Sequence, residues 1–168
     1  MKKIILSVIA VMAFGFANAQ DGHFKVGVHT GFAVGDASDA FSANLGADVA
    51  YLWKISNEFS AGATTGYTMY IGKTYTAYVG STAYVMIKSA NQGFVPVAGT
   101  AQYSITDNLF AGLDLGYAIN VGGDLDSGVL YQPKFGYQNK KIEIYAAFKG
   151  IDTNESLNSF NVGFNYKF

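Results

Sequence analysis

The chain has 168 residues, of which 50% are hydrophobic, 15% aromatic and only 14% charged, and its formal net charge is −1. The charge content is well below the roughly 25% of soluble domains, the aromatic content excludes a disordered chain, and after residue 20 there is no run of about 18 apolar residues to make a membrane helix. The sequence contains no cysteine, which excludes disulfides, thiolate catalysis and cysteine-ligated metals, and the weak net charge gives no basic surface for nucleic acid.

The first twenty residues predict export from the cytoplasm. Two lysines precede an apolar run from residue 4 to 17, and this run ends in a small-x-small cleavage motif. We therefore expect residues 1–19 to be a signal peptide, cleaved between Ala19 and Gln20, and residues 20–168 to form one domain. An uncleaved membrane anchor is the alternative, although the run is short and the cleavage motif follows it directly.

From residue 23 onward, aromatic and β-branched residues alternate with small and polar ones at a period of two, which predicts β-strands. Three connections are tight turns, and the four that alternate with them are longer and richer in Gly, Asp, Ser and Asn. Strands of about 9–11 residues with short turns at one end and long loops at the other are typical of a transmembrane antiparallel up-and-down β-barrel. The expected strands are about 23–33, 42–53, 58–71, 93–105, 108–120, 128–138, 141–150 and 158–168.

The two faces of these strands differ in their charge. Large apolar residues occupy one face of every strand, and the charges inside strands all fall on the other. A lysine facing lipid near the midplane costs roughly 2–4 kcal/mol, so the charged face is expected to line the lumen and the apolar face to meet lipid. A soluble lipocalin-like barrel is the alternative, with the apolar face turned inward. The expected polar network of the filled lumen is Lys25, His29, Asp48, Asp114, Lys134, Glu143, Lys149 and Lys167.

The end of the chain carries the most specific motif, the alternating run Phe160-Asn-Val-Gly-Phe-Asn-Tyr-Lys-Phe168. With this run, the chain after the signal peptide resembles the small eight-stranded outer-membrane β-barrels of Gram-negative bacteria, the OmpA/OmpX type, and the Ala19-Gln20 junction resembles that of Bacteroidetes secreted proteins. The resemblance implies a terminal strand that the barrel-assembly machinery recognises, and a location in the cell outer membrane. The residues that would fill this role are Phe160, Val162, Phe164, Tyr166 and Phe168.

The third connection, residues 72–92, is itself strand-like on both sides of Gly80-Ser81. We expect a hairpin in which the third and fourth strands continue past the membrane, with arms of 58–79 and 82–105. Its exposed edge would suit adhesion or the binding of an extracellular partner. The alternative makes 74–79 and 82–88 two further membrane strands and the barrel ten-stranded.

Residues that could carry chemistry are few. His29 could meet a lumen carboxylate as a general base, with Ser60 or Ser104 as a nucleophile, but a buried histidine satisfied by a carboxylate is the favoured interpretation. The loop Gly122–Gly128 holds two carboxylates two positions apart without the bidentate glutamate of an EF-hand, so a solvated acidic turn is favoured over a calcium site. We therefore predict no catalytic residue, no cofactor and no metal.

Three functions stay open. The favoured one is a non-enzymatic outer-membrane barrel with a structural or surface-interaction role through its loops. A narrow porin-like channel for small solutes is the second, and a lipid-modifying or proteolytic enzyme built around His29 is the third. The expected partners are outer-membrane lipid and lipopolysaccharide, the barrel-assembly machinery and an extracellular partner through residues 72–92, with no nucleic acid.

Overall fold

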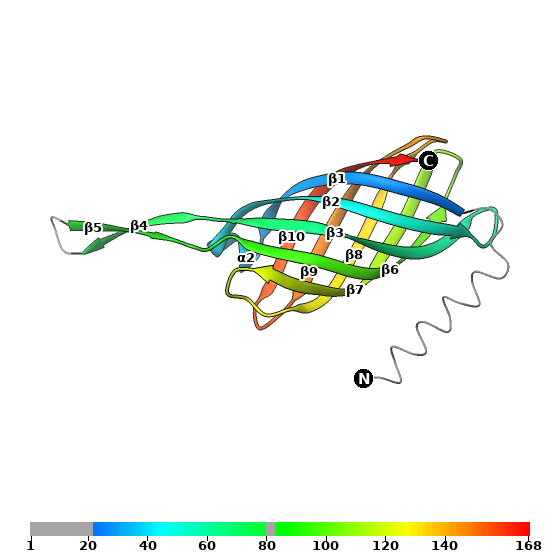
Figure 1. The fold of residues 1–168 in the computed structure, drawn as a ribbon. Coiled ribbons are helices and arrows are strands. Elements are labelled where there is room, and N and C mark those ends of the chain that lie inside the picture. The colour runs from blue at the N-terminus through cyan, green and yellow to red at the C-terminus, as the bar shows by residue number, and fades with distance from the viewer. Residues whose placement is uncertain (1–21, 80–82) are drawn as a thin grey trace, which may run out of the picture.

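Alternating apolar and small residues fold into long strands in the computed structural model, which describes residues 22–79 and 83–168. The predicted signal peptide and its cleavage site at Ala19-Gln20 lie outside the described residues. The strands wrap into a barrel, and two of them project from one end of it (Figure 1). The elements are β1 (Gly22–Val34), α2 (Ala37–Ala40), β2 (Phe41–Lys54), β3 (Phe59–Gly72), β4 (Thr74–Val79), β5 (Ala83–Lys88), β6 (Gln92–Ser104), β7 (Leu109–Gly122), β8 (Gly128–Gln138), β9 (Ile142–Asp152) and β10 (Ser156–Lys167).

The barrel is closed by eight strands in the order β1-β10-β9-β8-β7-β6-β3-β2. Every neighbouring pair is antiparallel, and β1 closes the ring against β10 with Phe32 opposite Phe160. The predicted all-β, eight-stranded up-and-down barrel is therefore confirmed. Among the described residues, no helix has the length and hydropathy to cross a membrane.

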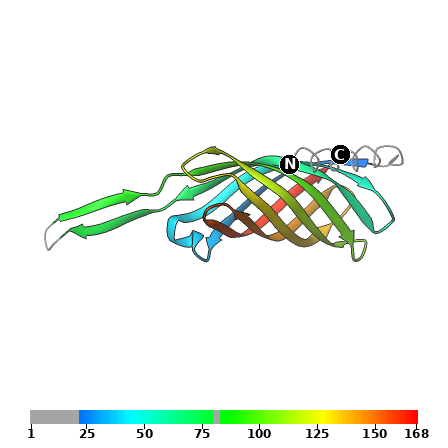
Figure 2. The same ribbon diagram turned by 90° about the horizontal axis from the view of Figure 1, so that it is seen from below.

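The third connection forms the predicted hairpin. β4 and β5 pair as a separate two-stranded sheet, and their register, with Thr74 opposite Lys88, continues the register that places Tyr70 opposite Gln92 between β3 and β6. Figure 2 shows this sheet extending well beyond the end of the barrel. The ten-stranded alternative is wrong, because β4 and β5 pair only with each other. The predicted meeting point at Gly80-Ser81 lies outside the described residues.

The connections at this end of the barrel, which we call the hairpin end, are shorter than predicted. Apart from the hairpin they are residues 35–40, 123–127 and 153–155, and the last is as short as the turn 139–141 at the opposite, turn end. The reason is that β9 and β10 run past their predicted ends: Ile151 pairs with Leu157, and both side chains are buried in the lumen. The predicted contrast in loop length is therefore large for the connection between β3 and β6, small for residues 35–40 and 123–127, and absent for residues 153–155.

The outer wall of the barrel is apolar. The large apolar residues assigned to the lipid face lie on its outside, as Leu115, Val162 and Phe135 illustrate with about half of their surface exposed. The alternate positions point inward, where Lys25, Asp114 and Lys149 are buried. This arrangement is opposite to that of a lipocalin-like barrel, in which the apolar face would fill the interior.

Both prolines of the chain interrupt a ladder of strand pairs. Pairing between β8 and β9 passes from Tyr131↔Gly150 to Lys134↔Ala147 and skips Pro133, while pairing between β3 and β6 skips the positions around Pro96. Because proline has no N–H, the Pro133 position gives no hydrogen bond to the Phe148 carbonyl opposite it on β9. The backbone pairing of the wall is therefore interrupted at two places, between β3 and β6 and between β8 and β9.

Candidate functional site: the lumen network and the hairpin

The turn-end half of the lumen is organised around Glu143 on β9. Its carboxylate accepts hydrogen bonds from Lys25 Nζ at 2.6 Å and Asn165 Nδ2 at 3.0 Å, and Lys167 Nζ lies 3.4 Å away. Gln102 Nε2 donates to the same carboxylate at 3.1 Å, and its Oε1 accepts from Lys25 at 2.6 Å. Four strands thus converge on one fully buried carboxylate.

His29 on β1 is the centre of a second cluster. Its Nδ1 lies 2.6 Å from Asp48 Oδ2, and its Nε2 accepts a hydrogen bond from Lys149 Nζ at 2.9 Å. Lys149 also donates to Thr68 Oγ1 at 3.0 Å. Because the ammonium donates to Nε2, the imidazole proton lies on Nδ1 and is donated to Asp48. A neutral imidazole therefore links a carboxylate to a buried ammonium.

Asp114 and Lys134 form the third cluster. Lys134 Nζ donates to Asp114 Oδ2 at 2.8 Å, and its ammonium lies 5.6 Å from the centre of the Tyr145 ring. A cavity of about 20 Å³, room for one water molecule, is lined by Asp114, Asp48 and Gln132 among others. The eight residues expected in the lumen are thus brought into three hydrogen-bonded clusters.

The sequence interpretation missed an apolar plug. At the hairpin end the lumen is filled by a cluster of fully or almost fully buried side chains, and α2 adds Ala37 to it. Above the polar clusters, Ser159 Oγ accepts hydrogen bonds from Asn44 Nδ2 at 2.7 Å and Asn161 Nδ2 at 3.0 Å. The large members of the plug are Phe41, Tyr70, Phe94, Leu130, Ile151 and Leu157.

A signal for the plug is present in the sequence. Phe94 on β6 and Leu130 on β8 occupy inward-facing positions near the hairpin end. On β7, which lies between these two strands, the inward-facing positions include Gly112 and Gly116. An assignment that places every large apolar residue on the lipid face overlooks Phe94 and Leu130. At the turn end, Phe110 and Leu52 are likewise fully buried, so apolar side chains occupy both ends of the lumen.

The geometry around His29 contains the elements of general-base chemistry, since a carboxylate, an imidazole and the Thr68 hydroxyl follow one another. However, His29 and Thr68 are almost completely buried, and Lys149 already bonds both. Ser104 accepts a bond from Gln138 and has no contact with this cluster. In the structure, this arrangement is a buried hydrogen-bonded network inside the barrel.

Metal-binding chemistry is equally weak in the part of the chain that the structure describes. No group of three or more His, Asp or Glu side chains there is arranged to hold a metal ion. Asp124 and Asp126 are exposed in the connection 123–127. They lie as a solvated turn, and the loop between Gly122 and Gly128 brings no third carboxylate to them.

The terminal strand has its five predicted assembly residues on the outer wall. Phe160, Val162, Phe164, Tyr166 and Phe168 are all exposed there, and the Phe168 amide donates to the Phe24 carbonyl at 2.9 Å. β10 therefore presents a continuous apolar strip while it closes the barrel. Recognition of this strip by the barrel-assembly machinery stays a prediction.

The hairpin is anchored at its base and free along its sides. The Lys73 amide donates to the Ala40 carbonyl at 2.8 Å, its ammonium donates to the Ser38 carbonyl at 2.5 Å, and the Ser89 amide donates to Lys73. Beyond this base, each of β4 and β5 pairs on one side only. The backbone groups of both outer edges therefore have no strand beside them within the described residues.

Comparison with known proteins gives the fold. No protein-family model and no curated protein matches the sequence. The crystal structure of Ail, the attachment invasion locus protein of Yersinia pestis, is 10% identical and has a TM-score of 0.55, over 88% of this chain and 97% of that one. A structure of the same outer membrane protein in a phospholipid bilayer nanodisc gives 12% identity and a TM-score of 0.54, over 88% of this chain and 100% of that one. A de novo designed transmembrane β-barrel gives 13% identity and a TM-score of 0.54, over 89% of this chain and 98% of that one.

These likenesses establish the class of fold. The chain is a closed eight-stranded antiparallel barrel of the kind found in outer-membrane proteins. At identities of 10–13% they carry no residue role from those proteins to this one.

Proposed function

We propose that the chain is an integral barrel of a Gram-negative outer membrane, and that it acts at the cell surface by binding a partner through the hairpin of β4 and β5. The apolar outer wall supports the membrane location, because burying that wall in hydrocarbon removes the need for a polar surface. The hairpin end would then be extracellular, with the short turns and the C-terminal Phe168 on the periplasmic side.

The observation that carries the binding role is the unpaired hairpin. An isolated two-stranded sheet is only marginally stable in water, so an added strand would gain backbone hydrogen bonds on a template that is already extended. Between Lys73 and Lys88 the sequence has no charged residue and no proline, and these are the devices by which exposed edges are usually protected from pairing. The partner would therefore be a protein segment that adds to the edge as a strand.

The filled lumen supports a role at the surface over transport. The narrow channel considered above needs a continuous water path, whereas Tyr70, Phe94 and Leu157 are fully buried across the hairpin end of the lumen. We propose that purified protein gives no single-channel conductance in planar bilayers. A steady ion-selective conductance would instead support the channel function. We also propose that the protein is not an enzyme, because Nε2 of His29 is already hydrogen-bonded to Lys149 Nζ and Thr68 Oγ1. Changed lipid A or changed surface proteolysis in a His29→Ala strain would contradict this.

The OmpA/OmpX type, the Bacteroidetes-like origin and recognition of the terminal strand by the barrel-assembly machinery belong to the same proposal. The whole-chain resemblance supports the type, the Ala19-Gln20 junction supports the origin, and the exposed strip of β10 supports the recognition.

The experiment compares adhesion of cells that express the full chain with cells in which residues 74–88 are replaced by a short Gly-Ser turn. Adhesion is measured to protein-coated, polysaccharide-coated and bare surfaces and to a layer of identical cells. We expect the replacement to lower adhesion to a protein-bearing surface while the barrel still assembles. Replacing residues 153–155 in the same way is the control. Unchanged adhesion on every surface would refute the role of the hairpin.

A further inference from the structure

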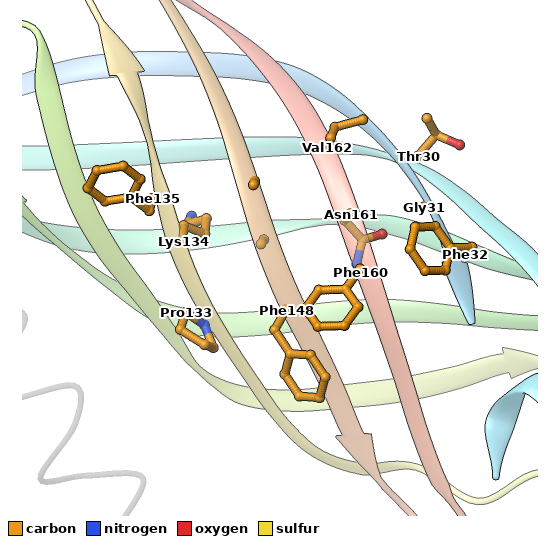
Figure 3. A pocket seen from close by; sticks show the side chains of 12 residues that line it. Thr30, Gly31, Phe32, Pro133, Lys134, Phe135, Phe148, Phe160, Asn161 and Val162 are labelled. Carbon is orange, nitrogen blue, oxygen red and sulfur yellow. The ribbon is translucent and has the colours of Figure 1, made fainter. Parts of the chain in front are cut away.

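The outer wall of the barrel carries a groove that crosses β8, β9, β10 and β1 (Figure 3). Its volume is about 660 Å³, and it is widely open on the outer side of the wall. Its walls include the aromatic side chains of Phe32, Phe135, Phe148 and Phe160. The groove lies on the face that we assign to lipid, outside the lumen, and its lining includes no residue of β4 or β5.

The hollow lies over a small outward residue, Ala146 on β9, which is exposed. Along β9 the outward residues from 142 to 148 are Ile142, Ile144, Ala146 and Phe148, so within this stretch a single methyl group stands where its neighbours carry large side chains. Across the sheet, Ala146 lies between Val162 on β10 and Phe135 on β8. These larger residues form the sides of the groove, and Ala146 forms its floor.

A row of aromatic rings closes the groove toward the hairpin end. The Phe148 and Phe160 ring centres are 5.3 Å apart, and those of Phe160 and Phe32 are 6.1 Å apart. Phe32 lies only two residues before the end of β1, which places this row near the hairpin end of the wall. Aromatic rings prefer the membrane interface, so the groove lies just beneath the outer interface, at the depth of the outer leaflet.

The wall of the groove is interrupted at Pro133. This residue lines the groove beside Phe148, at the point where the ladder between β8 and β9 lacks a bond. A proline in the interior of a barrel strand costs a ladder bond, and in hydrocarbon such a loss costs more than in water. The rigid ring here contributes an apolar surface without a flexible side chain.

We propose that this groove binds one acyl chain of lipopolysaccharide in the outer leaflet. The groove is continuous with the lipid-facing wall, whose neighbour is bilayer hydrocarbon. Lys134 is the one charged residue among the described residues that line it, and its ammonium is bonded to Asp114 in the lumen. The groove thus offers packing surface and no free charge, which suits a hydrocarbon chain and does not suit a headgroup. The inference rests on the membrane location and orientation proposed above and is independent of whether the hairpin binds a partner.

The test uses the full barrel reconstituted in nanodiscs that contain phospholipid and purified lipopolysaccharide. Lipid that stays bound after transfer to detergent is identified and counted by native mass spectrometry. The variant Ala146→Phe fills the floor of the groove. Ala47→Phe is the matched control, because Ala47 is an exposed alanine on the outer face of β2 and does not line the groove.

We expect wild type and Ala47→Phe to retain one lipopolysaccharide molecule, and Ala146→Phe to weaken its retention by about tenfold through lost packing contacts. Phe135→Ala removes one side of the groove and is expected to weaken retention too, so the proposal stays testable if Ala146→Phe does not fold. Equal retention by wild type and both groove variants would overturn it. Three other results would overturn it as well. One is loss of lipopolysaccharide retention in Ala47→Phe, and another is retention of phospholipid equal to that of lipopolysaccharide. The third is a dimer of the barrel that only the groove variants abolish, because the groove would then bind a second copy.

Failure of this inference and failure of the proposed function give different results. If the protein inserts into the nanodisc but retains no lipopolysaccharide, only the groove is refuted. If the protein does not insert into a bilayer at all, the proposed membrane location fails with it.

Discussion

Replacing Glu143 by glutamine is expected to be among the most damaging changes that conserve side-chain size in this protein. Glu143 is 1% exposed, and its carboxylate faces the ammonium groups of Lys25 and Lys167 together with the amides of Gln102 and Asn165. Glutamine has almost the same shape but no charge. The change therefore leaves a buried ammonium opposite a neutral amide.

The magnitude follows from what each partner retains. Without the Glu143 carboxylate, Lys25 keeps one strong acceptor, Gln102 Oε1 at 2.6 Å, and breaking a buried ion pair in this way costs about 3–5 kcal/mol of unfolding free energy. Without Lys25, Glu143 still has Lys167 and two amide donors. Lys25→Met is therefore expected to cost less than Glu143→Gln, although each single variant removes the same pair.

The assay is equilibrium unfolding in urea of barrels refolded into lipid vesicles, followed by the fluorescence of the single tryptophan. Combining the two changes in a double-mutant cycle gives the coupling free energy between Lys25 and Glu143. Lys167→Gln is the control, because Lys167 is partly exposed and lies 3.4 Å from a carboxylate that Lys25 already neutralises. It is expected to cost less than Lys25→Met, because the contact of Lys167 with the carboxylate is longer and its side chain is less buried.

The reasoning would be refuted if Glu143→Gln cost less than Lys25→Met, or if the coupling between the two residues were close to zero. Either result would mean that water reaches this part of the lumen and screens the charges. A continuous water path would then return as a serious possibility.

Three further predictions concern the wall. Leu113→Lys places a charge on the lipid face and is expected to lower the unfolding free energy by about 2–4 kcal/mol, whereas Leu113→Met should fold normally. Equal yields of folded protein for the two variants in gels would mean that the faces are assigned wrongly. Unboiled and boiled samples of wild type should migrate differently in detergent gels, and identical migration would count against a closed barrel. Pro133→Val supplies an N–H opposite the Phe148 carbonyl and is expected to stabilise the barrel by about 1 kcal/mol. The gain would be measured as a higher midpoint of urea unfolding. An unchanged midpoint would show that this carbonyl already has a hydrogen-bond donor.

The sequence predicted the barrel because its determinants are local. A period of two along each strand assigns every residue to one face, and the cost of placing charge in lipid leaves Lys25, Asp48 and the other strand charges only the inner face. The hairpin was also predictable from the sequence, since strand-forming residues resume at Thr74, directly after Gly72 and Lys73, and continue through residue 79. These features need no knowledge of which strands meet across the lumen.

The tertiary structure decided what lies across the barrel. Which side chains meet there depends on strand tilt and stagger around the closed ring, and the pattern along one strand does not encode either. For that reason the sequence could not show that Lys149 is bonded to His29 and Thr68, or that Ile151 and Leu157 join an apolar plug and shorten the last connection. The groove over Ala146 has the same origin, because a small residue becomes a hollow only when its neighbours on three other strands are large.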